Sequence, residues 1–186
     1  MEIGNKNTTI LKDTSSLYHI RHDTIEGWAD VFLATGDCSV SVMINSDYGV
    51  FSYSTEYCSR SPLEFIANAS KNHVLKKLFG KHRYVIDKEA CINQILVDIK
   101  NACNSGAISK DDSKRAVAYI DELQFSDPSL YYYQIVTDVV LGSIYQDSDS
   151  IPAHTTDNHI CEPLWNDIWL PFTNQLKKEI SLTSTH

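Results

Sequence analysis

Positive charge is missing from much of the C-terminal part of this chain. From Ala116 to Leu176 there are 61 residues without Lys or Arg, yet nine residues are Asp or Glu. These acids are Asp121, Glu122, Asp127, Asp138, Asp147, Asp149, Asp157, Glu162 and Asp167. A long stretch of one sign repels anions and attracts cations, whereas solubility alone is served by mixed signs. The stretch therefore predicts a basic partner and disfavours nucleic acid.

Motifs for catalysis and phosphate binding are also lacking. The chain has only seven glycines, with no G-x-x-x-x-G-K phosphate loop and no G-x-S-x-G nucleophile elbow. The acidic pairs Asp111-Asp112 and Asp121-Glu122 fall on a helix that we expect to be exposed, where acids cap and solvate the helix. We therefore predict a protein without enzymatic activity and without a cofactor.

Membrane and secretion signals are absent in the same way. No apolar run reaches the roughly 18 residues that a membrane helix needs, and residues 1–16 are polar. The five cysteines are widely spaced and none forms a C-x-x-C pair. This pattern predicts reduced thiols in a cytosolic protein.

One loop carries residue types that bind zinc. His154, His159 and Cys161 lie near Asp157, but their spacing matches no closed structural zinc site. We predict a solvated loop and no metal site, while the sequence leaves a metal role for this loop open.

One basic cluster interrupts the acidic composition. It comprises Lys71, Lys76, Lys77, Lys81, His82, Arg83 and Lys88. Cations at the end of a helix offset its dipole, and the net charge of −8 opposes contact with phosphates. We therefore expect no direct binding of nucleic acid.

The first third of the chain has the pattern of strands. Apolar residues alternate with others over residues 24–33, 38–45 and 48–57, and short turns separate the three segments. This predicts a three-stranded antiparallel meander. Residues 1–16 are polar and without period, so we expect them to form a flexible arm before a single domain over residues 17–186.

The remainder of the chain has the pattern of helices. Start and stop signals predict helices over residues 61–80, 87–104, 109–123, 127–141 and 163–180. The helix at 127–141 is apolar nearly all round, which predicts a central, buried position. Pro171 should kink the last helix. The expected fold class is α+β, with the meander packed against a bundle of about five helices.

Aromatic residues are concentrated in the acidic part of the chain. Tyr131-Tyr132-Tyr133 and the pair Trp165 and Trp169 exceed what one helix face can bury. Aromatics with polar tips commonly anchor interfaces, although each one alone is more typical of a core.

Several short motifs resemble those of small bacteriophage and prophage proteins. Those proteins share an "SDYG…Y" hairpin, a following "FL…DYLLGKL"-like helix and a C-terminal "W…P.F…L..E" helix. The corresponding residues here are Ser46-Asp47-Tyr48-Gly49, Phe51-Ser52-Tyr53, Phe65-Ile66, Lys76-Lys77-Leu78, Trp165, Pro171, Phe172, Leu176 and Glu179. The chain departs from the pattern at Thr55, where Trp is common, and at His73-Val74-Leu75, where the group has a "DYL"-like tripeptide.

The resemblance implies a phage accessory protein in the cytoplasm of a bacterial host, and such proteins are frequently inhibitors of host defence. Together with the acidic stretch, it leads us to expect a non-enzymatic inhibitor that binds a basic surface of a defence protein or complex. The expected partner-binding residues are Asp121, Glu122, Tyr131, Asp147, Asp149, Asp157 and Glu162. Two alternatives remain open: a protein that sequesters a small molecule such as a nucleotide signal, in a pocket between sheet and helices, and a structural homo-oligomer.

Overall fold

The computed structural model describes residues 15–23, 27–58 and 61–183. The chain divides into two compact units: unit 1 comprises residues 1–83 and 159–186, and unit 2 comprises residues 84–158. In sequence, unit 2 is therefore an insertion within unit 1, where we expected one continuous domain. Ser15 and Ser16, which we assigned to the flexible arm, begin the first strand. The rest of that arm lies outside the described residues.

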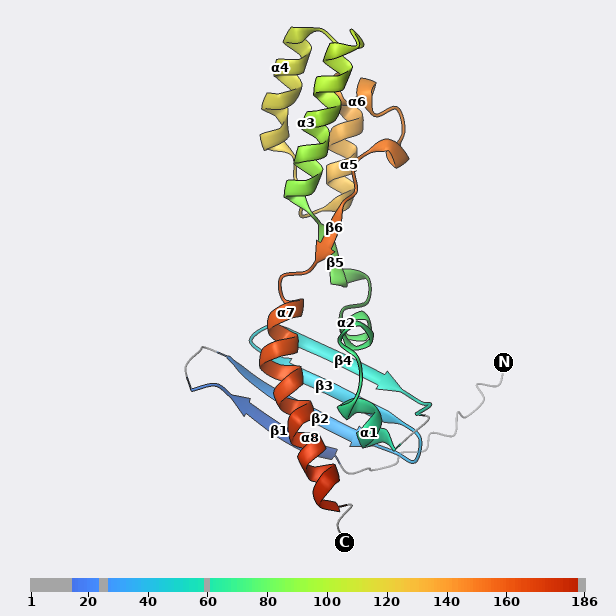
Figure 1. The fold of residues 1–186 in the computed structure, drawn as a ribbon, viewed down its shortest axis with the longest axis vertical. Coiled ribbons are helices and arrows are strands. Elements are labelled where there is room, and N and C mark those ends of the chain that lie inside the picture. The colour runs from blue at the N-terminus through green and yellow to red at the C-terminus, as the bar shows by residue number, and fades with distance from the viewer. Residues whose placement is uncertain (1–14, 24–26, 59–60, 184–186) are drawn as a thin grey trace, which may run out of the picture. The chain divides into compact units, whose positions relative to one another are not determined.

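Unit 1 is built on a four-stranded antiparallel sheet in the order β1-β2-β3-β4 (Figure 1). The strands are β1 Ser15–Arg21, β2 Trp28–Thr35, β3 Val40–Ser46 and β4 Gly49–Thr55. Each strand pairs with the next one along the chain, so the predicted meander is confirmed, with one strand more than expected. Part of the segment predicted as the first strand, residues 24–26, lies outside the described residues.

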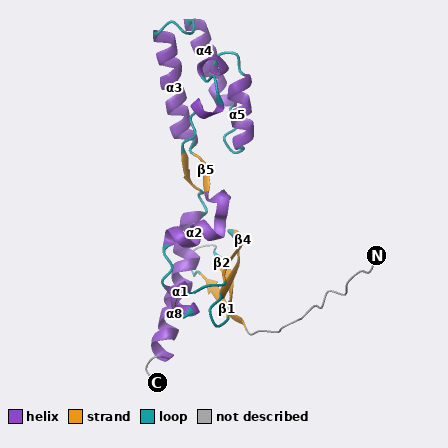
Figure 2. Cartoon of the chain, turned by 90° about the vertical axis from the view of Figure 1, so that its right-hand side faces the viewer, coloured by secondary structure: helices purple, strands orange, loops and turns teal. Residues whose placement is uncertain are grey.

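The two faces of this sheet differ in polarity because side chains alternate along each strand. On β3, Val40, Val42 and Ile44 are buried, whereas the intervening Ser41 and Met43 are exposed. Figure 2 shows the helices of unit 1 on one side of the sheet. The buried side chains of the sheet pack against these helices in a single hydrophobic cluster.

Strand β1 has too little apolar character to be found from sequence. Only Tyr18 and Ile20 pack against the core, while most of its residues are exposed. Its position is fixed by the next strand along the chain and by one residue that is distant in sequence. The Tyr18 hydroxyl donates to Glu179 Oε2 at 2.9 Å, and every β1 residue pairs with β2.

The helix predicted over residues 61–80 is two helices. They are α1 Pro62–Ala67 and α2 Lys71–Phe79, followed by the short helix η1 Gly80–Arg83. Pro62 occupies the first turn as expected, but the Ser61 side chain makes no capping bond. The chain restarts at Ser70, whose side chain accepts the backbone N–H of His73 at 3.3 Å. The cap at Ser70 thus begins a second helix where one long helix was predicted.

The C-terminal helix is continuous but changes its winding before Pro171. It consists of α7 Cys161–Pro163, the π-helical segment η4 Leu164–Trp169 and α8 Leu170–Thr183. Where we predicted a kink, the backbone widens, so that the N–H of Leu170 donates to the carbonyl of Trp165, five residues earlier. A π turn of this kind accommodates one extra residue without ending the helix.

Unit 2 is mainly helical. Its elements are β5 Tyr84–Ile86, α3 Lys88–Asn104, α4 Lys110–Tyr119, η2 Ile120–Glu122, α5 Pro128–Thr137, α6 Leu141–Ile144, η3 Ser148–Ser150 and β6 Thr155–Asp157. The strands β5 and β6 pair antiparallel at the two ends of the unit's sequence. A hydrophobic cluster of its own joins α3, α4, α5 and α6.

Three helix starts in unit 2 lie where the capping residues predicted them. The side chains of Asp87, Ser109 and Asp127 each accept a backbone N–H in the first turn of α3, α4 and α5. The α+β class is therefore correct, and the number and lengths of the elements differ from the prediction.

The expected all-round burial of the fourth helix is wrong. Helix α5 ends at Thr137, and its side chains Tyr133 and Val136 are 65% and 51% exposed. Val117 on α4 is also 44% exposed. These side chains are exposed because each helix is covered on one side only by its neighbours in this small unit.

Candidate functional site

The division into units concentrates the negative charge of the protein. Unit 2 has five basic and twelve acidic residues, a formal charge of −7, whereas unit 1 has eleven and twelve, a formal charge of −1. All five basic residues of unit 2 precede residue 116. All charged residues of unit 2 after residue 115 are therefore acidic.

Two of the predicted acids lie on the short helix η2. Asp121 and Glu122 are exposed there. The adjoining segment is held to α5 by one side chain, because Gln134 Oε1 accepts the N–H of Gln124 at 2.8 Å and Gln134 Nε2 donates to the carbonyl of Glu122 at 3.2 Å. This clamp fixes the acids on the outside of unit 2.

The next two acids lie just before and within the helix η3. Asp147 and Asp149 are exposed, and the Asp147 carboxylate accepts the backbone N–H of Ser150 at 2.9 Å. Asp157 is exposed on strand β6, opposite Tyr84. Unit 2 thus carries the predicted acids at several places on its surface, and they do not form one tight cluster.

Few of these carboxylates are neutralised locally. The ion pairs recorded in unit 2 join Lys114 to Asp111 at 3.2 Å and Arg115 to Asp112 at 3.5 Å, both on α4. Asp121, Glu122 and Asp149 make no ion pair with any described residue. Their charge is therefore presented to solvent.

A small acidic hollow lies beside η2. It has a volume of about 280 Å³ and is lined by Arg115, Ala118, Tyr119, Glu122, Asp138 and Val140. The pKa of Tyr119 is raised, first by burial and then by the negative charges of Asp138 and Glu122. Two carboxylates, a tyrosine and one cation, Arg115, therefore line this hollow, and Arg115 is itself paired with Asp112. The remaining negative charge suits the cationic end of a Lys or Arg side chain.

Tyr131 does not belong to the surface, which corrects our expectation. Its side chain is fully buried, and its hydroxyl donates to the carbonyl of Pro152 at 2.8 Å. The exposed aromatic of the triplet is Tyr133. The helical period of the sequence could have predicted which tyrosine is exposed. Tyr131 and Ile135 are four residues apart and form the buried face of α5, so Tyr133 points outward.

Glu162 belongs to unit 1 and interacts there with two side chains. Its carboxylate pairs with Lys71 and accepts a bond from Asn166 Nδ2 at 3.1 Å. Trp169 is fully buried in the core of the same unit, and Trp165 is half-buried against it. The acidic stretch seen in the sequence is therefore shared between two units, and only its first part belongs to unit 2.

The three residues that could bind zinc are also divided between the two units. His154 is in unit 2, and His159 and Cys161 are in unit 1. Cys161 is buried, with Sγ 4.0 Å from the carbonyl oxygen of Arg83. In the described parts of the chain, no three His, Cys, Asp or Glu side chains come together in a way that could hold a metal ion.

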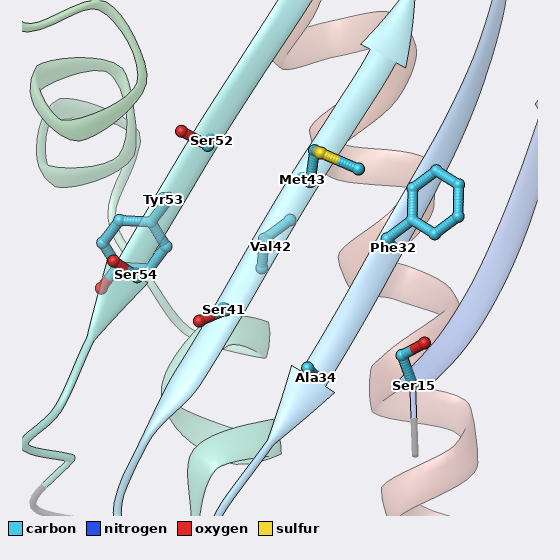
Figure 3. A pocket seen from close by; sticks show the side chains of 9 residues that line it. All are labelled: Ser15, Phe32, Ala34, Ser41, Val42, Met43, Ser52, Tyr53 and Ser54. Atoms are coloured by element: carbon cyan, nitrogen blue, oxygen red, sulfur yellow. The ribbon is translucent and has the colours of Figure 1, made fainter. Parts of the chain in front are cut away.

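Unit 1 has a different candidate surface on the side of its sheet opposite the helices. Leu17, Phe32, Met43 and Ser52 are aligned across the four strands. Beside this row lies a shallow apolar hollow of about 280 Å³. Figure 3 shows its lining: Ser15, Phe32, Ala34, Ser41, Val42, Met43, Ser52, Tyr53 and Ser54. The hollow lies on the outer face of the sheet, whereas the second of our sequence hypotheses placed a pocket between sheet and helices.

Asp30, which lies two residues before Phe32 on β2, is paired with side chains of β1. His19 Nδ1 and Arg21 Nη2 each lie 2.8 Å from Asp30 Oδ1. The bond with His19, and then the bond with Arg21, lowers the pKa of Asp30. Arg21 also lies over the Trp28 ring at 5.7 Å. None of the residues lining the hollow is charged, so the hollow offers no cation for a phosphate.

No helix within the described residues combines the length and apolarity that crossing a membrane requires.

Comparisons with known proteins give one family. No curated protein and no solved structure matches the chain. The sequence profile of the Phage_phiTE_072 family, described as "Phage family", matches residues 10–179. This match covers most of the chain and confirms the resemblance to small phage proteins. The chain therefore belongs to this phage family.

Proposed function

We propose that this phage protein is a non-enzymatic inhibitor that binds a basic surface of a host defence protein through unit 2, in the cytoplasm of the bacterial host. The observation that carries the proposal is the charge of −7 on the 75 residues of unit 2, with no basic residue after residue 115. A surface of one sign steers an oppositely charged partner and excludes nucleic acid.

The acidic hollow beside η2 supplies a specific contact for such a partner. A Lys or Arg side chain that entered it would meet Glu122, Asp138 and Tyr119. It would also meet Arg115, whose charge is balanced by Asp112 at 3.5 Å. Asp138 is already held in place, because its Oδ1 accepts the N–H groups of Val140 and Leu141 at 3.0 and 2.8 Å. A fixed carboxylate loses little freedom when a partner binds, which favours affinity.

The exposed apolar residues of α5 supply the uncharged part of the interface. Tyr133 and Val136 lie one turn apart on the outer side of the helix. A tyrosine anchor beside acids is the composition expected of a docking patch for a basic protein groove. Tyr133 takes the place that the sequence analysis gave to Tyr131.

Charge reversal in unit 2 tests the proposal. The tagged protein is used to capture its partner from host lysate at low and high salt, and association with the purified partner is then timed. The first variant carries Asp121→Lys, Glu122→Lys, Asp147→Lys and Asp149→Lys. We expect association to slow by about tenfold or more at low salt, and the wild-type rate to fall as salt is added.

A matched variant separates local charge from total charge. It carries the same number of reversals at exposed acids of unit 1: Asp37→Lys, Asp47→Lys, Glu56→Lys and Glu64→Lys. Association as fast as that of the wild type is expected for this variant. If both variants associate equally slowly, or both at the wild-type rate, the assignment to unit 2 is wrong.

The alternative of a small-molecule binder finds support in the hollow on the sheet of unit 1. Its lining of apolar and serine side chains suits an uncharged apolar ligand better than a nucleotide, because no cation lines it. Mass spectrometry of the denatured pure protein detects a ligand that copurifies. A nucleotide released in stoichiometric amount would favour this alternative over the inhibitor. The homo-oligomer alternative predicts a dimer or larger species by light scattering.

A further inference from the structure

The turn between β2 and β3 contacts the chain that leaves β4. The N–H of Gly36 donates to the carbonyl of Ser39 at 2.9 Å, which makes Asp37 and Cys38 the two residues of a tight hairpin loop. The N–H of Cys58 donates to the carbonyl of Cys38 at 2.8 Å. Two cysteines 20 positions apart in sequence are therefore neighbours in unit 1.

This backbone bond sets a separation that a disulfide can span. Residues that exchange two backbone hydrogen bonds in an antiparallel pair have Cα atoms roughly 5.5 Å apart, and the single short bond between Cys58 and Cys38 holds their Cα atoms at a comparable distance. Disulfides are found at Cα separations of roughly 4.4–6.8 Å. No rearrangement of the strands is needed to bring the two residues within this range.

The thiols themselves are free and differ in exposure. Cys38 is exposed, and Cys58 is half-buried and packs against the core of unit 1. The pKa of Cys58 is raised, first by burial and then by the charge of Cys38. One thiol is thus open to solvent, and a second, protected thiol lies beside it.

The other cysteines have different surroundings. Cys91 is buried, and its Sγ donates to the carbonyl of Pro152 at 3.4 Å. Cys161 is also buried, and Cys103 is half-buried on α3. Exposure beside a second thiol is the arrangement of cysteines that oxidise reversibly, whereas buried thiols are inert.

We propose that Cys38 and Cys58 form a redox modification site at which a peroxide converts two thiols into one intrachain disulfide. The Cys38 thiolate attacks hydrogen peroxide, which gives a sulfenic acid on Cys38 and releases hydroxide that is protonated to water. The Cys58 sulfur then attacks the sulfenic sulfur, the S–S bond forms, and the sulfenic oxygen leaves as a second water. Two electrons and two protons pass from the thiols to the peroxide. Cys38 reacts first because it is the exposed thiol, and Cys58 resolves the intermediate.

The disulfide would close a loop that contains both β3 and β4. A cross-link of this kind restricts the unfolded chain and raises the unfolding temperature. It would also tie together the ends of the two strands that supply Ser41 and Ser54 to the hollow of Figure 3. The oxidised protein should therefore hold this end of the sheet more rigidly than the reduced protein.

Peptide mapping of the full-length protein tests the proposal. The reduced protein is treated with hydrogen peroxide, the remaining thiols are alkylated, and intact mass and peptides are measured without reductant. We expect three alkylated cysteines instead of five, one cross-linked peptide that contains Cys38 and Cys58, and loss of two hydrogen atoms from the protein. Dithiothreitol should restore five alkylated cysteines and return the raised unfolding temperature to that of the reduced protein.

Two single variants complete the test. Cys58→Ser should leave Cys38 as a sulfenic acid, trapped by dimedone, with no rise in unfolding temperature, and Cys103→Ser should cross-link like the wild type. A cross-link that joins two chains through Cys38, or oxidation of Cys38 with Cys58 still alkylated in the wild type, would overturn the proposal. Both results are read from the same peptides.

Discussion

The Tyr48 hydroxyl donates to Asp167 Oδ2 at 2.8 Å and so joins the β3–β4 turn to the C-terminal helix across 119 positions of sequence. Tyr48 belongs to the hairpin motif, and Asp167 lies between Trp165 and Pro171 of the helix motif. Two of the short motifs that resemble those of phage proteins are therefore in direct contact in the folded unit 1. The resemblance thus includes residues that hold the sheet and the helix together.

Tyr48→Phe should destabilise the protein, because it leaves the Asp167 carboxylate without its tyrosine donor. A hydrogen bond to a charged group contributes about 1.5–3 kcal/mol, and partial exposure places this one near the lower value. Urea unfolding measures the loss. Tyr57→Phe is the control, since Tyr57 is 86% exposed, and an equal loss in both variants would contradict the assignment.

Alkaline pH should weaken unit 1 through two tyrosines. The bond to Asp167, and then burial, raises the pKa of Tyr48 from 10.0 to about 12. Burial, and then the bond to Glu179, raises the pKa of Tyr18 to about 12 as well. Because the folded pKa lies above the unfolded pKa, this stabilisation is complete below pH 10 and is lost as pH rises through 12.

Unfolding free energies below pH 10 and at pH 12 check this prediction. The wild type should lose more stability between the two than a Tyr18→Phe, Tyr48→Phe double variant, which has neither group to ionise. Parallel losses would show that the tyrosines do not carry the effect.

His22 should be coupled energetically to Pro171. Pro171 has no N–H to give to the carbonyl of Asp167, four residues earlier, and His22 Nε2 lies 2.8 Å from that oxygen. His22→Ala should cost about 1 kcal/mol, because it removes this donor. Pro171→Ala restores a backbone donor, so the cost of His22→Ala should be smaller in that background. A double-mutant cycle in urea measures the difference, and strict additivity would rule the coupling out.

Gly142→Ala should destabilise unit 2, although alanine is the better helix former. A Cβ at Gly142 would lie 2.6 Å from the carbonyl oxygen of Val136, a backbone atom that cannot turn aside. Overpacking of this kind costs about 1–3 kcal/mol, which exceeds the gain in helix propensity. Thermal unfolding measures the sign. Ser143→Ala, one residue along the same helix, is the control, and a stabilised Gly142→Ala protein would disprove the close packing.

Tyr133 and Tyr131 should respond oppositely to substitution. Tyr133→Ala should change stability by less than about 0.5 kcal/mol, because its side chain is mostly exposed, and should weaken partner binding. Tyr131→Ala should cost about 3–5 kcal/mol through the cavity that it leaves. Urea unfolding of both variants, with partner binding by Tyr133→Ala, separates the docking residue from the core residue. A Tyr133→Ala protein with unchanged affinity would remove α5 from the interface.

Local signals explain what the sequence predicted well. Asp87, Ser109 and Asp127 each cap a helix whose first turn lies within a few residues, so the start of the helix depends on nearby backbone groups. The alternation of β3 was equally clear, because one face of that strand is buried and the other is exposed. The absence of Lys and Arg from residues 116–176 is a property of the sequence itself.

Tertiary contacts decided the features that local signals do not predict. Strand β1 has a weak apolar pattern of its own. It is held by β2, the next strand along the chain, which supplies its backbone partners, and by Glu179, 161 positions away, which receives the Tyr18 hydroxyl. Local signals also did not predict the insertion of unit 2 into unit 1, which assigns Glu162 to unit 1 and the other predicted acids to unit 2. The packing of α5 buries Tyr131 and leaves Tyr133 exposed. The sequence by itself determined the α+β class, the helix caps and the acidic composition, because these depend on neighbouring residues or on counts. Only the tertiary structure decided which charges and aromatics share a surface, because that depends on which faces the packing covers.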